Sequence, residues 1–553
     1  MRTVHWLFLL LILSQTWAEP AEDLLQKAQG FLRAGEKQSA IDTCEEALNL
    51  NPQNPDTVLH LGKILIDAGQ TKRGLECMDQ IARVHPSQKR HIVVGEAAIQ
   101  LEQWQTAEFH FNAALKLQPT IEIHQSLAWI YEELGKGEQS LQHRSKAVAL
   151  KMPQIRGLPF KTPVTMQSQS KAQLAQFLLQ DMQKELPDEK ANAIEIALKA
   201  FGLVPESFSL KPTMLRLLTE QIGGFYNPET KKLYLIAEGP RARGPLEKLM
   251  GQPRDDAQER LVIAHEMTHA LQDQHYNLLG LDKKVKQNDD WSLAYQALLE
   301  GDAMLGMLDY QYFPKRLDKD DAFALRMTMS LMKFFMPFME QQLSQVPAVI
   351  RESLLFPYTD GLYFCLEFRT SENPWTNINR CYKRLPRSTE HILHPEKYLA
   401  KEPVWDCRIP DFSSLLGDKW QEKMNNVMGE FTCRIVFSAY NIAGHASLAQ
   451  GWAGDRYSVL QNEAGQRALI WLTKWDTLQD AKEFFDGYHQ LLLKKYPGMT
   501  WKAQESYVEG KNPTFAVVLV RHRDRVCVLE QIPENLIATL RQKVMQIQFT
   551  KMR

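Results

Sequence analysis

Four prolines recur at a nearly constant interval near the start of the chain, and this period constrains the fold more than any other feature. The intervals are 34, 33 and 34 residues, between Pro52, Pro86, Pro119 and Pro153. Small residues recur in the same register, at Ala28, Gly62, Gly95 and Ala128. Such a period predicts stacked pairs of helices in an all-α solenoid, because each unit must bury its apolar face against the next.

The small-residue positions are followed one turn later by an aromatic side chain in two of the units, Phe31 and Tyr131. Together with the period, this pattern resembles the tetratricopeptide repeat, in four units over residues 19–153. The resemblance implies a concave groove that binds a peptide or protein partner. A rigid spacer or a folding partner for the rest of the chain is the alternative.

A second motif, His265-Glu266-Met267-Thr268-His269, lies in an apolar run that predicts a helix from about residue 257 to residue 276. On a helix the two histidines lie one turn apart on the same face, so both imidazoles can bind one zinc ion. Glu266 stands beside them and can take a proton from a metal-bound water molecule. The motif predicts a zinc hydrolase; an amphipathic helix with two surface histidines is the alternative.

A catalytic zinc ion needs a third protein ligand. His275 has the spacing of a third histidine ligand, but Gln272 occupies the position where a glycine would turn the chain, so a continuing helix carries His275 past the metal. Glu300 is preferred, because it fills a gap in the apolar stripe of the next predicted helix, where a carboxylate needs a partner. A buried Glu–Arg pair is the alternative. The stripe consists of Leu293, Ala297, Met304 and Met307.

The HEMTH motif, followed by Glu300 in the sequence Glu-Gly-Asp-Ala, resembles the gluzincins of the thermolysin-like peptidase clan and the MA-like peptidase domains of bacterial proteins. The resemblance implies an α+β zincin-like domain over residues 156–402. It also implies a bound Zn2+ with His265, His269 and Glu300 as ligands and Glu266 as the general base.

Two further roles have several candidates in the sequence: orienting the imidazoles of the ligands and stabilising the oxyanion. Many gluzincins carry an Asp four residues after the ligand Glu; here Met304 stands there, so Asp302 or another residue must orient the imidazoles. His394 or Tyr398 could stabilise the oxyanion of the tetrahedral intermediate, with ordinary loop residues as the alternative. Tyr358 and Tyr363 are weaker candidates for that role.

Residues 223–236 read as a strand, a turn and a second strand. Zincins bind the substrate backbone along a strand edge beside the active-site helix, and this hairpin could supply such an edge. A purely structural hairpin is the alternative.

The chain of 553 residues is long enough for several domains. Residues 1–18 predict a signal peptide, because a short apolar run precedes small residues at a cleavage site. From residue 403 the pattern changes to an α+β domain with an antiparallel sheet, which extends to residue 553. Strands are expected at residues 456–460, 467–473, 501–508 and 515–520, and helices at 478–495 and 535–546.

Seven cysteines are scattered through the chain without a CxxC pair, so a cysteine zinc site is not expected. Cys381 and Cys407 are one pairing that could form a disulfide in an exported protein. Basic and acidic residues number 65 and 66, so no global field favours nucleic acid.

We therefore expect an exported zinc metallopeptidase, periplasmic or secreted, with protein or peptide substrates, repeats that recruit substrates or partners, and no transmembrane segment after signal cleavage. The first alternative is a non-catalytic repeat scaffold or chaperone-like binding protein with a retained peptidase fold. Glu266 argues against it, because a scaffold does not need that carboxylate. The second alternative is a zinc hydrolase of non-peptide amides.

Overall fold

The computed structural model describes most of the chain in two compact units, one ending at Lys151 and the other beginning at Met152. The expected signal peptide at residues 1–18 lies outside the described residues. None of the described helices combines the length and the apolar character that a bilayer span needs. The described residues are 20–221, 224–236, 257–318, 320–321, 346–370, 374–417 and 419–552.

The first unit is built from consecutive helices of 13 or 14 residues, and the period of the prolines explains their boundaries. Asn54, Ser87 and Thr120 follow three of the prolines and cap the next helix by accepting a hydrogen bond from a backbone N–H of its first turn. The helices are α2 (Pro20–Arg33), α3 (Lys37–Asn49), α4 (Pro55–Asp67), α5 (Thr71–Val84), α6 (Gln88–Gln100), α7 (Trp104–Leu117), α8 (Ile121–Glu133) and the longer α9 (Gly137–Arg156).

The small residues in the repeat register allow neighbouring helices to approach closely, as the sequence predicts. A Cβ atom on Gly62 of α4 would lie 2.9 Å from the carbonyl oxygen of Gly74 in α5, and one on Gly95 of α6 would meet the ring of Phe111 at 2.7 Å. Ala28 and Ala128 are buried at the equivalent positions. The helix pairs therefore pack with their backbones close together.

Two buried histidine pairs occupy equivalent positions in successive repeats. The Nδ1 atoms of His91 and His110 are 2.9 Å apart, and those of His124 and His143 are 3.0 Å apart. Each pair joins two consecutive helices, and the second pair lies 33 residues after the first. Burial lowers the pKa of His124 and of His143 to about 4, so both are neutral at neutral pH and one Nδ1–H group donates to the other Nδ1 atom.

The second unit begins with a small sheet in the order β1-β3-β2. β2 (Gly224–Asn227) and β3 (Lys232–Ile236) form the antiparallel hairpin that the sequence predicts, and β1 (Thr165–Gln169) adds to β3 in parallel. Helices α10 (Lys171–Glu185) and α12 (Leu210–Gln221) pack against each other. Stacked rings of Phe177, Phe225 and Tyr234 join α10 to the hairpin.

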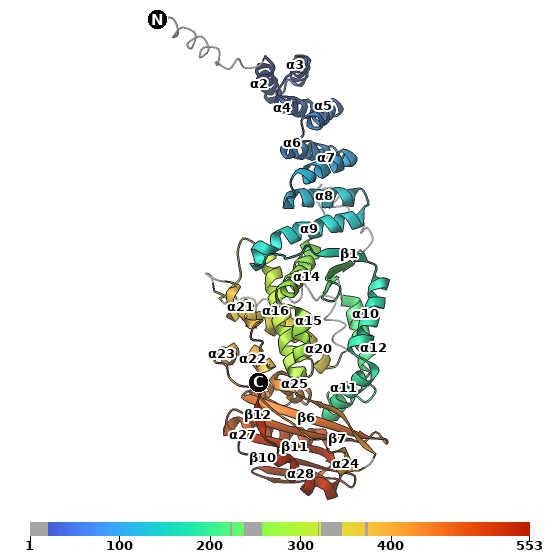
Figure 1. Cartoon of the computed structure of the whole chain (residues 1–553), viewed down its shortest axis with the longest axis vertical. Helices are drawn as coiled ribbons and strands as arrows, with labels where there is room; N and C mark the ends of the chain where they lie inside the picture. Colours follow the sequence, from blue (N-terminus) through green and yellow to red (C-terminus); the bar gives the residue numbers. More distant parts are fainter. Residues whose placement is uncertain are drawn as a thin grey trace, which may run out of the picture. The chain divides into compact units, whose positions relative to one another are not determined.

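Long helices form the centre of the second unit (Figure 1). α16 (Asp289–Tyr312) packs against both α14 (Ala257–Tyr276) and α20 (Ala348–Glu367). α15 (Leu278–Val285) lies between α14 and α16 in the chain and contacts both. A Cβ atom on Gly301 of α16 would lie 2.1 Å from the backbone of Gly361 in α20, so only glycine permits this crossing.

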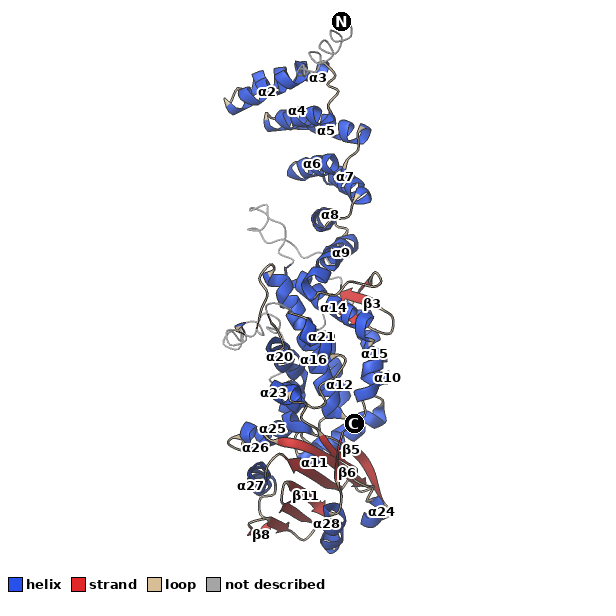
Figure 2. Cartoon of the chain, turned by 60° about the vertical axis from the view of Figure 1, so that its left-hand side comes forward, coloured by secondary structure: helices blue, strands red, loops and turns tan. Residues whose placement is uncertain are grey.

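A nine-stranded mixed sheet follows, together with helices that cover it (Figure 2). The strand order is β12-β4-β6-β7-β11-β10-β9-β8, and β5 also pairs with β6. The pairing of β4 with β6 is parallel and the others are antiparallel, so the expected purely antiparallel sheet is wrong in this detail. The strands are β4 (Trp405–Cys407), β5 (Trp420–Asn426), β6 (Trp452–Asn462), β7 (Arg467–Trp475), β8 (Thr500–Gln504), β9 (Tyr507–Lys511), β10 (Ala516–His522), β11 (Arg525–Ile532) and β12 (Phe549–Lys551).

The expected single strand at residues 501–508 is instead the hairpin of β8 and β9, because the chain turns at Glu505 and Ser506. The expected helices are present as α27 (Leu478–Lys495) and α28 (Ile537–Met545). The shorter helices of this unit are α21 (Thr376–Cys381), α22 (Thr389–Leu393), α23 (Pro395–Leu399), α24 (Ser413–Leu416), α25 (Gly429–Ala439) and α26 (His445–Ala449).

Alternating side chains of β7 bury both faces of the large sheet. Leu469 and Trp471 point into a core shared with α11 (Asp188–Phe201), α25 and α27, whereas Ile470 and Leu472 point into a core shared with α28. The rings of Phe201 and Trp471 meet edge to face at 5.3 Å. The domain boundary expected at residue 403 lies inside the second compact unit.

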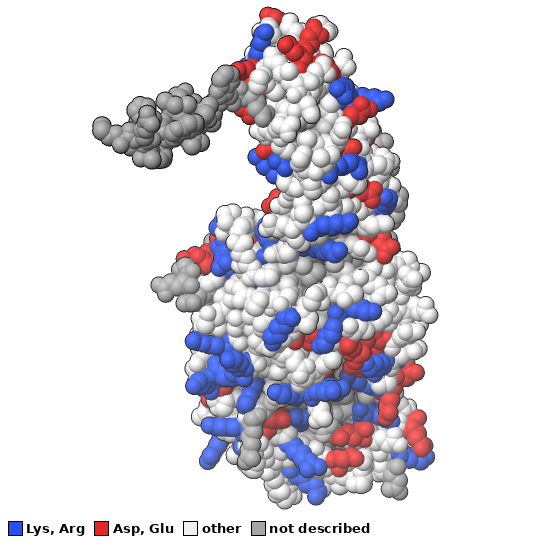
Figure 3. Space-filling view, turned by 45° about the horizontal axis from the view of Figure 1, so that its top comes forward, with Lys and Arg blue, Asp and Glu red and all other residues white. Residues whose placement is uncertain are grey.

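All seven cysteines are free and buried. The pairing of Cys381 with Cys407 is wrong, because the two side chains lie in different apolar cores. Lys and Arg side chains are interspersed with Asp and Glu on the face seen in Figure 3. Local contacts, rather than a field of one sign, therefore set the electrostatics of individual sites.

Candidate metal centre

The side chains of His265, His269 and Glu300 converge, and we call these three residues the metal centre. The Nε2 atoms of the two histidines are 3.1 Å apart. The Oε2 atom of Glu300 lies 3.1 Å from Nε2 of His265 and 3.4 Å from Nε2 of His269. Two imidazoles and one carboxylate are a donor set that suits a catalytic zinc ion.

Local sequence places the two histidines, and helix packing places Glu300. The opposite side of α14 carries fully buried apolar residues, which leaves His265 and His269 together on the partly open side. α16 approaches closely because Gly306 faces Thr268, where a Cβ atom would meet Oγ1 at 2.7 Å. This approach brings Glu300 to the histidines across 35 residues of sequence.

Gln272, one turn after His269, orients that imidazole. Its Oε1 atom lies 2.8 Å from Nδ1 of His269. Its Nε2 atom donates to the carbonyl oxygen of Leu299 and to Oδ2 of Asp302, both at 3.0 Å. Because both of these partners are acceptors, Oε1 must face the histidine, so Nδ1 of His269 carries the proton. In the neutral imidazole, the form that binds a metal ion, the lone pair of Nε2 is then directed to the metal centre.

Asp302 supports the histidine through Gln272 and not by direct contact. Its carboxylate also pairs with Arg156 at 2.7 Å and accepts a hydrogen bond from the Tyr382 hydroxyl at 2.6 Å. These three side chains are buried, and Arg156 and Asp302 have no exposed side-chain surface. The structure therefore places a buried carboxylate, paired with Arg156, behind Gln272 as the support that the sequence left unassigned.

Glu266 lies against the hairpin, as a general base beside a substrate-binding strand would. Its Oε2 atom accepts a hydrogen bond from the backbone N–H of Tyr226 in β2, at 2.8 Å. Burial raises the pKa of Glu266, although the neighbouring histidines and this hydrogen bond oppose the rise. β2 is at the edge of the small sheet, and the backbone of its Tyr226 contacts Glu266 beside the metal centre.

Opposite charges dominate the metal centre. Burial disfavours the charged form of His269, but Glu300 and Glu266 outweigh it and raise the pKa of His269 to about 10. The same histidines hold the pKa of Glu300 well below its usual range in spite of burial. The cluster thus stabilises a positive charge at its centre, which a divalent cation also provides.

Tyr358 of α20 is the aromatic hydroxyl that the structure brings to the metal centre. Its ring stacks on His265 with centroids 6.2 Å apart, and its hydroxyl group lies near enough to Glu300 for that carboxylate to act on it. The charge of Glu300 raises the pKa of Tyr358 well above its usual value, so it is a donor at neutral pH. Local sequence does not predict this position of Tyr358, because the packing at the Gly301–Gly361 crossing brings α20 here.

His394 and Tyr398, the oxyanion candidates favoured by the sequence, have partners outside the metal centre. His394 contacts Glu430 at 3.0 Å, and the hydroxyl group of the buried Tyr398 donates to the carbonyl oxygen of Arg384 at 2.6 Å. His275, the disfavoured metal ligand, is bonded through Nε2 to the carbonyl oxygen of Pro159 at 2.8 Å and does not join the cluster. A continuing helix carries it away from the metal centre, as expected.

Another acidic group in the described part of the chain, Glu390 with Glu402 and Asp476, also has metal-like spacing. The ammonium group of Lys397 already lies among its carboxylates, at 2.6 Å from Glu390. The charge of this group is therefore compensated within the protein.

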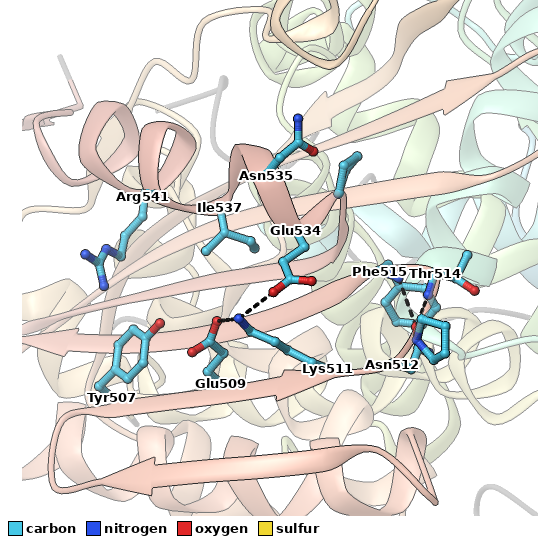
Figure 4. A pocket seen from close by; sticks show the side chains of 13 residues that line it. Tyr507, Glu509, Lys511, Asn512, Thr514, Phe515, Glu534, Asn535, Ile537 and Arg541 are labelled. Atoms are coloured by element: carbon cyan, nitrogen blue, oxygen red, sulfur yellow. Dashed lines mark hydrogen bonds and ion pairs between the residues drawn. The ribbon is translucent and has the colours of Figure 1, made fainter.

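A surface hollow of about 700 Å³ lies between β9 and α28 (Figure 4). Lys511 forms ion pairs with Glu534 at 2.8 Å and with Glu509 at 2.9 Å across it. Arg541 lies over the ring of Tyr507. Because its charged groups are paired with one another, we assign no ligand to this hollow.

Two family models match parts of the chain. A tetratricopeptide repeat model matches residues 31–92, so the first unit contains these repeats, as the sequence predicts. A model described as a domain of unknown function (DUF8575) matches residues 416–540, within the region of the large sheet. Neither match includes the metal centre.

Solved structures of the MamA protein are similar to about a quarter of the chain. One is 20% identical with a TM-score of 0.21 and covers 25% of this chain and 75% of its own. Another is 21% identical with a TM-score of 0.20 and covers 23% and 77%. No curated protein matches the chain.

Proposed function

We propose that this protein is a zinc-dependent peptidase whose repeats bind proteins. The observation that carries the proposal is the convergence of His265, His269 and Glu300 beside Glu266, which is held by the edge strand β2. When bound, zinc would polarise a carbonyl group and lower the pKa of a water molecule.

The chain's own residues supply the remaining requirements for peptide hydrolysis. Glu266 takes a proton from the attacking water and passes it to the leaving amine, a task that suits a carboxylate whose pKa is raised by burial. The outer edge of β2 aligns an extended peptide by backbone hydrogen bonds. The hydroxyl group of Tyr358 donates a hydrogen bond to the oxyanion.

A non-catalytic repeat scaffold or chaperone-like binding protein is the second candidate. The repeat match at residues 31–92 supports protein binding, because stacked repeats of this kind present a concave surface to partners. The comparisons support this binding role, whereas the peptidase rests on the geometry of the metal centre alone. A zinc hydrolase of non-peptide amides would use the same four residues.

Elemental analysis and a cleavage assay distinguish the candidates. The purified chain and its Glu266→Gln variant are assayed for zinc and for cleavage of an unfolded protein such as reduced casein. One zinc ion per chain in both proteins, with cleavage only by the unsubstituted chain, supports the peptidase. Zinc without cleavage of any peptide leaves the amide hydrolase, and absence of zinc leaves the scaffold.

A further inference from the structure

A cavity of about 320 Å³ lies in the second unit among α11, α16, α20 and β5. Its volume is at the lower end of the range for ligand pockets, so it has room for one long side chain. Most of its surface is apolar. The apolar walls include Phe201, Leu203, Val349, Ile350, Met424 and Val427.

Asp289 and Asp290 place two carboxyl groups in one part of this cavity. Asp290 is 3% exposed, and its Oδ1 atom accepts hydrogen bonds from the backbone N–H and the hydroxyl group of Thr389. Its Oδ2 atom accepts no hydrogen bond from any residue that the structure describes. No Lys, Arg or His is among the described residues that line the cavity.

Cations in this region act on other acidic groups: Arg434 pairs with Glu430, and Lys190 and Arg456 act on Asp289. The largest charge effects on the carboxyl group of Asp290 come from Asp455 and Glu430, which are also acidic. Burial together with these neighbours raises the pKa of Asp290 to about 7. A buried carboxylate without a cation is costly, so a basic ligand group would find an electrostatically complementary site here.

The cavity and the metal centre both include residues of α16, and Asp290 is about 15 Å along the axis from Glu300. Asp289, Leu293, Gln296 and Glu300 are spaced by four, three and four residues, which places them on the same side of the helix. Along the axis, Gln296 lies about 6 Å and Leu293 about 10 Å from Glu300. A substrate at the metal centre can therefore reach the cavity with a nearby side chain.

We propose that this cavity is the subsite for a lysine or arginine side chain of a peptide substrate. The inference rests on the proposed peptidase function and names its substrate class. The apolar walls pack the aliphatic stem, and Asp290 pairs with the cationic end. Asp290 lies about 15 Å along the axis from Glu300, which corresponds to about four or five residues of extended peptide, so cleavage falls within about five residues of the basic side chain.

Binding to the zinc-loaded Glu266→Gln chain tests the subsite without turnover. The probe is a fluorescein-labelled peptide of eight residues, alanine and glycine with one central arginine. Its matched control carries citrulline, which has the shape of arginine without the charge. Fluorescence anisotropy is expected to show at least about tenfold tighter binding of the arginine peptide.

Asp290→Asn retains an acceptor for Thr389 but removes the charge, and is expected to abolish this preference. Asp282→Asn on α15, outside the cavity, is the matched control and is expected to retain it. Equal affinity for the two peptides, or a preference that survives Asp290→Asn, overturns the proposal. If Asp290→Asn does not fold, Val349→Trp fills the cavity with all charges in place and must abolish the preference.

Failure of the peptidase proposal gives a different result. The unsubstituted chain would then cleave neither peptide with zinc present, while the Glu266→Gln chain still preferred arginine. Cleavage of both peptides without any preference in binding would retain the peptidase and overturn the subsite.

Discussion

The Oε1 atom of Gln272 accepts a hydrogen bond from the Nδ1–H group of His269, with 2.8 Å between the two atoms. The glutamine amide is itself held by Asp302 and by the carbonyl oxygen of Leu299. This arrangement selects the tautomer of His269 that leaves Nε2 free to bind a metal ion. A neutral amide thus performs the orienting task that a carboxylate often performs in zinc sites.

Gln272→Ala is expected to weaken zinc binding about 10- to 100-fold, because His269 loses the group that orients it. Competition with a chromogenic chelator measures the dissociation constant. Gln274→Ala on the same helix is the control, since Gln274 bonds only to the segment at Lys161 and Thr162. Equal affinities for the two variants would show that His269 needs no such support.

Glu300→Ala is expected to lose the zinc ion, whereas His275→Ala retains it. Glu300 contacts both imidazoles of the metal centre, and His275 is bonded to Pro159 away from it. Elemental analysis after dialysis gives the zinc content of each variant. Retention of zinc by Glu300→Ala together with its loss from His275→Ala would reverse the assignment of the third ligand.

Tyr358→Phe is expected to lower kcat by about 100-fold while zinc content and KM stay nearly unchanged, because the hydroxyl group acts on the oxyanion. Steady-state kinetics on a fluorogenic peptide measures both constants. Tyr398→Phe is the control, since its hydroxyl group bonds to Arg384 inside the core. A fall in kcat for Tyr398→Phe alone would restore the candidate favoured by sequence.

Acid is expected to loosen the helices that contain His124 and His143. The pKa of each is lowered from 6.5 to about 4 in the folded chain, so the unfolded chain binds more protons between these values. The free energy of unfolding is therefore highest above pH 6.5 and falls as the pH drops towards 4, by on the order of 3 kcal/mol for each histidine.

Hydrogen exchange of α8 and α9, corrected for the intrinsic pH dependence, measures this loss in the full chain. A double variant with leucine at both positions, His124→Leu with His143→Leu, should lose the pH dependence. His60→Gln changes an exposed histidine of α4 and should respond to acid as the unsubstituted chain does. The same acid response in the double variant would contradict the assignment to this pair.

Features that depend on neighbouring residues could be predicted from the sequence. The helix at residues 257–276 and the helix at residues 478–495 have the predicted bounds, because their apolar periodicity and end signals are local. The hairpin of β2 and β3 is likewise present. The strand predicted at residues 501–508 is wrong, since the turn at Glu505 and Ser506 lacks a glycine or proline signal.

The sequence alone determined the helical repeat and the positions of His265, Glu266 and His269, because a 34-residue period and one turn of helix are properties of short segments. It also favoured Glu300 as the third ligand, and the carboxylate of Glu300 contacts both histidines. Only the tertiary structure decided that Tyr226 holds Glu266, that Gln272 connects His269 to Asp302, and that Tyr358 covers His265. These contacts join residues 30 to more than 90 positions apart, and they depend on how α14, α16, α20 and β2 pack, which local periodicity does not encode.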